Sequence, residues 1–138
     1  MKQTFPAEAP APGQARRAAA EFAAGEGADA DTLAAIALCV SEAVTNAVVH
    51  AYRDQAQPGA VEIEARRPNG YLCLYVRDRG CGLKPRLDSP GLGLGLPLIA
   101  TLAESLELGT GSNQETEVRM TFDLDGAGDG AGVPAGPA

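Results

Sequence analysis

The chain has 138 residues and a net charge of −7, with 45% hydrophobic and 21% charged residues. This length is that of one ordinary domain with its own core, and these proportions exclude a wholly disordered chain. The 17 glycines follow no triplet period, which excludes collagen, and the acidic balance argues against direct binding of nucleic acid.

Cysteine spacing and hydropathy indicate where the protein works. The cysteines are odd in number and lack the spacing of a zinc site, so we expect no disulfide framework, no zinc and a cytoplasmic setting. No stretch approaches the apolar length that spans a membrane, and the first residues lack the apolar run of a signal peptide. We therefore predict no membrane span and no export signal.

The first half of the chain predicts a strand and two helices. Residues 2–5 favour a short edge strand, and apolar residues recurring every three or four positions predict a helix over 13–24. A second, stronger helix begins at Asp29 or Asp31 as N-cap and runs to about Tyr52. Its apolar residues lie on one face, which is typical of a helix packed on a core.

The second half predicts most of a sheet. Alternating or continuous apolar residues predict strands over 61–65, 71–76, 106–108 and 117–124 and a short helix over 96–104. The strand over 71–76 is apolar throughout, so we expect it to be buried on both faces.

The economical architecture for these elements is an α/β (α+β) two-layer sandwich, with helices on one face of a mixed, mostly antiparallel sheet. The domain occupies residues 1–125. Residues 126–138 contain small residues, two prolines and one charge, too little apolar surface to fold, and we expect a flexible tail there.

The second helix carries few ionisable side chains. Between residues 32 and 51 they are Glu42 and His50, which form an i, i+4, i+8 ladder with Asn46 opposite the apolar stripe. A carboxylate, a carboxamide and an imidazole on successive turns suit a site that holds a metal-bound anion and accepts a proton. The alternative is an ordinary exposed polar stripe on an alanine-rich helix.

Two glycine motifs follow. Asp78, Gly80 and Gly82 come directly after the buried strand, where a carboxylate lies beside backbone that a flat ring could approach. The alternative is a polar turn in which the glycines supply positive φ.

Further along, Gly91, Gly93 and Gly95 lead through Leu96 into a helix. Because glycines have no Cβ atom, their backbone N–H groups can approach phosphates closely, and the N-terminus of the following helix also favours an anion. The spacing of the glycines is neither that of a P-loop nor that of a Rossmann motif. The alternative is a flexible loop without a ligand.

The three motifs in this order resemble the GHKL (Bergerat-fold) ATP-binding superfamily, and within it the small bacterial anti-sigma-factor serine/threonine kinases. Residues 41–52 are similar to the family's N-box, with Glu42 at the general-base position and Asn46 at the magnesium-ligand position. His50 either touches the metal site or caps the helix. Positions that match the nucleotide-binding motifs are Asp78, Gly80, Gly82, Gly91, Gly93, Gly95, Leu96 and Thr116.

The resemblance implies a Bergerat-type sandwich that binds ATP and Mg²⁺. Asp78 would receive the adenine amino group, and Thr116 would close the adenine pocket. Glu42 would accept the proton of a serine or threonine hydroxyl on an anti-anti-sigma (STAS-type) partner. The resemblance also implies sequestration of a sigma factor, a homodimer, and contact with a partner through Arg16 or Arg17. Glu115 stands where the family usually has glycine.

Other functions remain to be weighed. A sensor histidine kinase is disfavoured because His50 is the only histidine and lies inside the N-box, and gyrase-like ATPases need a second domain. The rival from another class is a non-catalytic nucleotide-binding module that acts through protein contacts. The plainest reading is an α/β scaffold without a nucleotide.

Overall fold

The computed structural model describes residues 1–51, 59–79, 95–111 and 115–124. Its elements in chain order are β1 (Lys2–Pro6), α1 (Ala11–Gly25), α2 (Ala30–Asn46), the π-helical turn η1 (Ala47–Ala51), β2 (Ala60–Arg66), β3 (Tyr71–Asp78), α3 (Gly95–Leu102), β4 (Ser105–Thr110) and β5 (Thr116–Asp123). The predicted tail lies outside the described residues.

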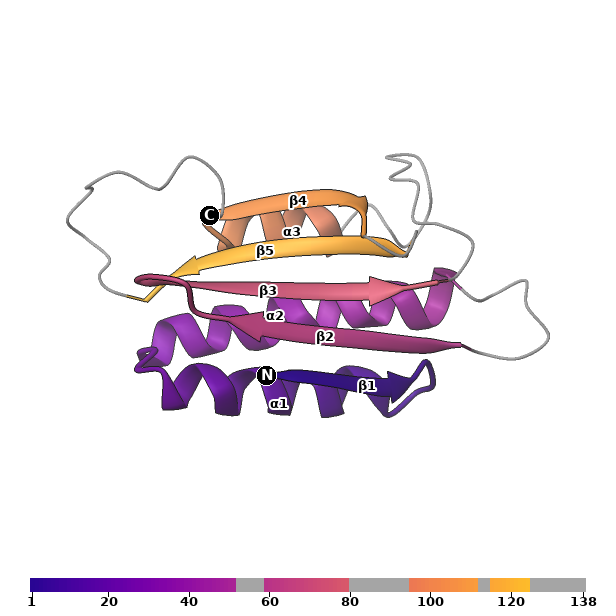
Figure 1. Ribbon diagram of the computed structural model, residues 1–138, viewed down its shortest axis with the longest axis horizontal. Coiled ribbons are helices and arrows are strands. Elements are labelled where there is room, and N and C mark those ends of the chain that lie inside the picture. The colour runs from indigo at the N-terminus through magenta and orange to yellow at the C-terminus, as the bar shows by residue number, and fades with distance from the viewer. Residues whose placement is uncertain (52–58, 80–94, 112–114, 125–138) are drawn as a thin grey trace.

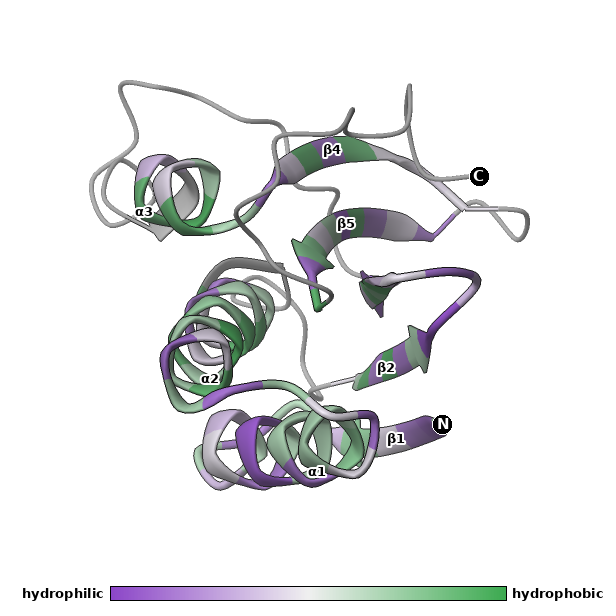
Figure 2. Ribbon diagram, turned by 90° about the vertical axis from the view of Figure 1, so that its left-hand side faces the viewer, coloured by the Kyte–Doolittle hydropathy of each residue, from purple (hydrophilic) through white to green (hydrophobic). Residues whose placement is uncertain are grey.

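The described strands form one five-stranded sheet in the order β1-β2-β3-β5-β4. The helices cover one face of it, which confirms the two-layer sandwich (Figures 1 and 2). All pairings between these strands are antiparallel. The prediction of a mixed, mostly antiparallel sheet is therefore correct in its antiparallel part, but the described strands include no parallel pair. A short turn at 67–70 joins β2 to β3, and such a turn can connect only antiparallel neighbours.

Small side chains bring α1 close to α2. Ala11, Ala15, Ala19 and Ala23 are fully buried at intervals of four, so α1 presents a flat stripe to its neighbour. The helix starts two residues earlier than predicted. The chain then turns at Gly27, whose φ of 93° favours glycine, as the sequence indicates.

The central helix α2 begins at the predicted cap. The Asp29 carboxylate accepts a hydrogen bond from the Thr32 backbone N–H at 2.8 Å, which satisfies a free donor of the first turn. The α-helix ends at Asn46, not near Tyr52, and the chain continues as the π-helical turn η1.

By length and composition, Ala30–Val49 could cross a membrane, since it has 20 residues with a hydropathy of 1.7. The sequence analysis predicts no span, and packing accounts for the apolar composition. Ile36, Val40 and Val44 are completely buried in the core between the helices and the sheet, where Figure 2 shows apolar helix surface turned to the strands. A core helix of this kind needs no membrane to cover it.

The core is aliphatic, as the composition predicts. Its largest fully buried side chains are Ile36, Ile63, Leu72, Leu74, Ile99 and Met120. Four of these side chains come from the strands: Ile63 from β2, Leu72 and Leu74 from β3, and Met120 from β5. The middle of the sheet therefore carries most of the contact with the helices.

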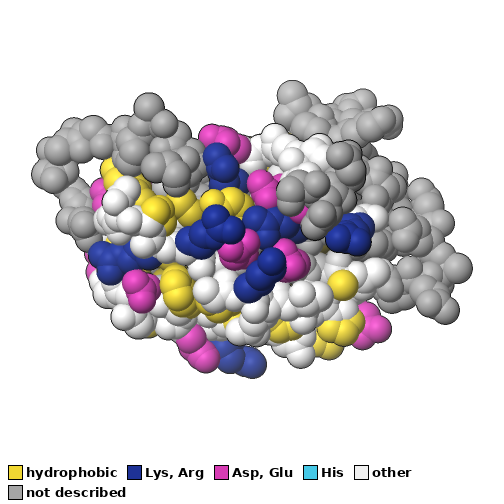
Figure 3. Space-filling view, viewed as in Figure 1, with side chains coloured by type: hydrophobic (Ala, Val, Ile, Leu, Met, Phe, Trp, Pro, Cys, Tyr) yellow, Lys and Arg dark blue, Asp and Glu magenta, His cyan; other side chains and the backbone are white. Residues whose placement is uncertain are grey.

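The other face of the sheet is covered by its own charged side chains. Figure 3 shows basic and acidic side chains gathered over the strands on this open face. Tyr75 of β3 is only 8% exposed there, because the guanidinium carbons of Arg77, Arg66 and Arg119 lie 4.8, 5.3 and 5.9 Å from its ring centroid. This layer is why β3 is buried on both faces, as predicted.

We predict that Leu74→Ala lowers the free energy of unfolding by about 2–5 kcal/mol, because it empties space at the centre of the core. The matched control is Leu38→Ala on α2, where the side chain is 42% exposed and the expected change is within about 0.5 kcal/mol. Urea unfolding followed by circular dichroism measures both. Equal losses in the two variants would contradict the packing described here.

Candidate functional site

Two predicted site residues meet where β3 ends and β5 begins. Asp78 is the last residue of β3 and pairs directly with Thr116, the first residue of β5. Alternation along β3 places the Asp78 side chain on the face of Leu74 and Val76, which is the face that the helices cover. Asp78 is only 4% exposed, so its carboxylate lies between the two layers.

The end of α2 reaches the same edge of the sheet. Val48 of η1 packs against Ala7, whose backbone N–H donates to the Gly59 carbonyl at 2.9 Å. Gly59 directly precedes β2, and Val61 of β2 pairs with Asp78. Figure 1 shows η1, the end of β3 and the start of β5 at this one end of the sandwich.

Asn46, the last residue of α2, is a buried polar side chain in this region. It is 3% exposed, and its Nδ2 finds no hydrogen-bond partner in the described part of the chain. A buried donor left unpaired costs about 1–3 kcal/mol, so a ligand or a water that accepted a hydrogen bond from it would stabilise the site. An ordinary exposed polar stripe is therefore wrong for Asn46.

Glu42 lies one turn before Asn46 and is half-buried. Residues at i and i+4 of an α-helix lie on the same side, so the carboxylate and the carboxamide are neighbours. Burial and, to a smaller extent, the nearby Glu42 carboxylate raise the pKa of the Cys39 thiol to about 11. Cys39 therefore stays a neutral thiol at physiological pH.

The predicted ladder does not extend unchanged to His50. The π-helical turn η1 has more residues per turn than an α-helix, so it changes the phase of the backbone after Asn46. The side chain of His50 lies outside the described residues. Turns of this type are frequent at functional sites, and the sequence gives no signal for this one.

The glycine motifs are described only in part. Gly80, Gly82, Gly91 and Gly93 lie outside the described residues, as does the Leu96 side chain, while Gly95 is the first residue of α3.

The start of α3 faces the same end of the molecule. The chain leaves α3 where the Glu104 N–H donates to the Thr121 carbonyl at 2.7 Å, far along β5 from Thr116. Because α3 runs along the strands (Figure 1), its first residue lies toward the Thr116 end.

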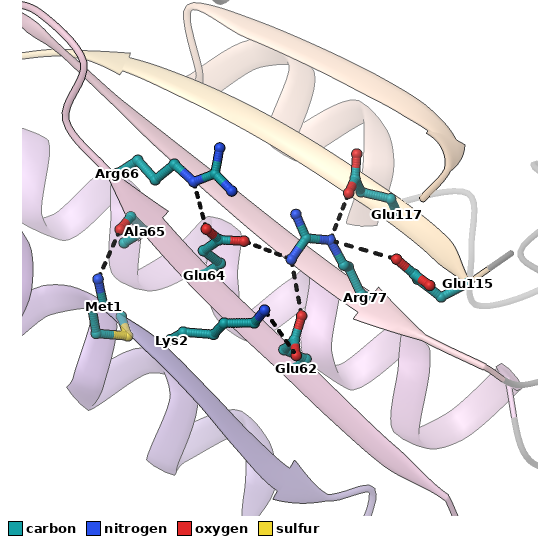
Figure 4. A network of polar contacts seen from close by, with 9 residues as sticks. All are labelled: Met1, Lys2, Glu62, Glu64, Ala65, Arg66, Arg77, Glu115 and Glu117. Carbon is teal, nitrogen blue, oxygen red and sulfur yellow. Dashed lines mark hydrogen bonds and ion pairs between the residues drawn. The ribbon is translucent and has the colours of Figure 1, made fainter. Parts of the chain in front are cut away.

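Glu115, which stands in place of the family's glycine, turns away from this region. Its carboxylate lies 4.0 Å from Nε of Arg77 on the open face, as Figure 4 shows. Thr116 follows it and therefore points to the helix side. The bulk of Glu115 thus lies across the sheet from Asp78. The sequence analysis overlooked Arg77, although the alternating Glu62 and Glu64 of β2 hinted at a cation opposite them.

No three His, Cys, Asp or Glu side chains within the described ranges gather into a metal site. A magnesium ion that accompanies a nucleotide needs fewer protein ligands, because phosphates and waters complete its coordination. An amide oxygen is a suitable ligand for it, and the buried Asn46 carboxamide fits this requirement.

A comparison with protein families matches residues 5–122 to the histidine kinase-like ATPase domain. Among curated proteins, the anti-sigma F factor of Caldanaerobacter subterraneus subsp. tengcongensis is 31% identical over 118 residues, which cover 78% of this chain and 81% of that protein. The anti-sigma F factor of Clostridium kluyveri is 32% identical over 103 residues, 65% of this chain and 70% of that protein.

Among solved structures, the RsbU and RsbW domains of Rv1364c from Mycobacterium tuberculosis match with a TM-score of 0.67 and 26% identity. The match covers 90% of this chain but only 31% of that longer one. The similarity therefore includes nearly all of the sandwich described above.

We predict that Asn46→Leu leaves the free energy of unfolding without nucleotide unchanged, or raises it by up to about 3 kcal/mol, because an apolar side chain of similar size removes an unpaired buried donor. The exposed neighbouring variant Thr45→Leu should change it by less than about 0.5 kcal/mol. Urea unfolding without ligand provides the measurement. A clear loss of stability in Asn46→Leu would show that the carboxamide has a structural partner.

Proposed function

Because the chain belongs to the histidine kinase-like ATPase family, we propose that it is an anti-sigma-factor kinase that binds ATP between α2 and the sheet. It transfers the terminal phosphoryl group to a serine or threonine of an anti-anti-sigma (STAS-type) protein. It also sequesters a sigma factor, acts as a homodimer in the cytoplasm, and contacts its partners through Arg16 or Arg17 of α1. The similarity to anti-sigma F factors supports this assignment.

The observation that carries the proposal is the pairing of Asp78 with Thr116 at the end of the sandwich that α2 reaches. Asp78 offers a buried carboxylate that can accept a hydrogen bond from the adenine amino group. Thr116, its direct partner on the neighbouring strand, would close the adenine pocket beside it. Both side chains face the helix layer, so the base would lie between the layers.

The phosphates would extend from this pocket toward α2 and α3. Asn46 would hold Mg²⁺ through its amide oxygen. When bound, Mg²⁺ neutralises the charge of the phosphates. The N-terminus of α3 at Gly95, with the preceding Gly91 and Gly93, offers backbone N–H groups to the phosphate oxygens.

Glu42 would accept the proton of the hydroxyl group that attacks the terminal phosphorus. Glu42 lies one turn before Asn46, and side chains with this spacing have their Cβ atoms about 5–6 Å apart. Glu42 would therefore lie close to the phosphates that Asn46 would hold through Mg²⁺. Its partial exposure leaves room for a side chain of another protein.

We predict that Glu42→Gln keeps its affinity for ATP but phosphorylates a STAS-type partner roughly 10² to 10⁴ times more slowly, because it removes the general base. Incubation of the chain with labelled ATP, Mg²⁺ and recombinant STAS-type proteins measures the rate. Glu21→Gln, an exposed position on α1, is the matched control and should react like the wild type. Unimpaired transfer by Glu42→Gln would remove Glu42 from the mechanism.

The same assay tests the function as a whole. A labelled STAS-type protein supports the kinase. Stoichiometric binding of nucleotide and partner without a phosphoprotein would instead establish a non-catalytic module. An ATP concentration one hundred times the dissociation constant should stabilise the folded chain by about 2.7 kcal/mol, and no stabilisation would favour a scaffold without a nucleotide.

We predict that Asp78→Asn weakens binding of a non-hydrolysable ATP analogue at least about tenfold, because a hydrogen bond to a charged group contributes about 1.5–3 kcal/mol. The control is Asp123→Asn at the other end of the β3–β5 pair, opposite Tyr71, which should bind like the wild type. Isothermal titration calorimetry gives both constants. An unchanged constant for Asp78→Asn would refute this placement of the base.

A further inference from the structure

The open face of the sheet carries a cluster of ionic contacts centred on Arg77. Its guanidinium lies 2.9 Å from Glu62, 2.7 Å from Glu64, 2.6 Å from Glu117 and 4.0 Å from Glu115. We call these five residues the Arg77 cluster. Figure 4 shows the carboxylates converging on Arg77 from β2 and from the beginning of β5.

The cluster lies directly behind the Asp78–Thr116 pair. Arg77 precedes Asp78 on β3, so their side chains point to opposite faces of the sheet. Thr116 stands between Glu115 and Glu117, both of which contact Arg77. One guanidinium on the open face therefore joins the backbone segments that carry the two site residues on the other face.

The centre of the cluster is shielded from water, while Glu62 at its rim is 30% exposed. The Arg77 side chain is 14% exposed, and those of Glu64 and Glu115 are 11% and 9% exposed. Burial lowers the pKa of Arg77, but hydrogen bonds to Glu117, Glu64 and Glu62 outweigh it and raise the pKa. Lys2 and Arg66 also contact Glu62 and Glu64, but Arg77 is the cation that lies between Glu64 of β2 and Glu117 of β5. Without its guanidinium, these two carboxylates would lose the positive charge between them.

Gly111, at the end of the described part of the β4–β5 connection, lies against the Glu115 side chain. The Gly111 N–H donates to the Glu115 carbonyl at 2.8 Å, and a side chain at position 111 would overlap the Glu115 carboxylate. The connection from β4 to β5 thus accommodates a glutamate beside Thr116 and directs it toward Arg77.

We propose that Arg77 is a positioning residue of the nucleotide site, which holds β2, β3 and β5 in register from the open face and so fixes Asp78 and Thr116. This inference rests on the proposed function, in which Asp78 and Thr116 contact the base. A small displacement of such groups is costly, since a misplacement of about 1 Å can reduce function about 100-fold. The geometry explains how a residue that touches no nucleotide governs its affinity.

The test uses Arg77→Gln and Arg77→Lys, with calorimetric titration of a non-hydrolysable ATP analogue and of adenosine. We expect Arg77→Gln to weaken binding of both ligands by a similar factor, at least about tenfold. Arg77→Lys keeps the charge but loses the planar fork, so its loss should be smaller. Circular dichroism checks that each variant is folded at the temperature of titration.

The matched control is Arg119→Gln. Arg119 lies on the same open face over the same Tyr75 ring and contacts Glu107 at 3.0 Å, but it pairs with Tyr75 rather than with the strand end. We expect its dissociation constants to stay within about twofold of the wild type. If Arg77 acted only through the general stability of the sheet, Arg77→Gln and Arg119→Gln would raise the dissociation constants by similar factors.

Titrations of a charged and an uncharged ligand at two salt concentrations distinguish two explanations. Arg77 could act by positioning Asp78 and Thr116, or by changing the electrostatic field at the site. A field effect would weaken the ATP analogue far more than uncharged adenosine and would fade between about 0.05 M and 0.5 M salt. That result would overturn the inference. So would wild-type constants in folded Arg77→Gln and Arg77→Lys, or equal losses in Arg119→Gln.

If Arg77→Gln does not fold, Glu117→Gln carries the test, because it removes the charge of the carboxylate that pairs with Arg77 between β3 and β5 without changing side-chain size. We expect a loss of at least about threefold for both ligands. Wild-type binding by both Glu117→Gln and Arg77→Lys would overturn the inference. Asp78→Asn keeps the two failures apart: if it also binds like the wild type, the proposed function itself fails.

Discussion

The register between β3 and β5 is the constraint on which the site depends. It places Asp78 opposite Thr116 on the helix side and Arg77 opposite Glu117 on the open side. A slip of one residue would turn every side chain to the other face, burying charges in the core and moving the carboxylate away from α2. The aliphatic side chains of β3 resist such a slip because they are needed in the core. The same pairing therefore contributes to the stability of the sheet and sets the arrangement of the proposed site at its end.

The central helix departs from the rules of a core helix at the end that carries the proposed site. Most of α2 follows the rules for a core helix, with a capped start at Asp29 and fully buried aliphatic residues. Its last turn departs from them, because Asn46 is buried with an unpaired donor and the backbone changes to a π-helical turn. Both departures occur at the end of the molecule where Asp78 lies. Local rules are typically broken at functional positions, where a ligand supplies the missing interactions.

Much of the fold follows from local patterns in the sequence. Apolar periodicity and the Asp29 cap predicted the helices and strands to within a few residues, except for the end of α2. The sheet order could not be predicted, because it depends on contacts between distant segments. The Arg77 cluster was overlooked for the same reason: Glu62, Arg77 and Glu117 are neighbours only once β2, β3 and β5 are paired. Asp78 and Asn46 were predicted from motifs, but their burial became evident only in three dimensions.

A crystal structure of the chain with an ATP analogue and Mg²⁺ tests the central claim most directly. The account predicts the base between the layers, with its amino group within hydrogen-bond distance of the Asp78 carboxylate, the phosphates toward Asn46 and Gly95, and the Arg77 cluster intact behind them. A nucleotide on the open face, or at the Tyr71 end of β3, would contradict it. So would a bound base that leaves the Asp78 carboxylate without contact.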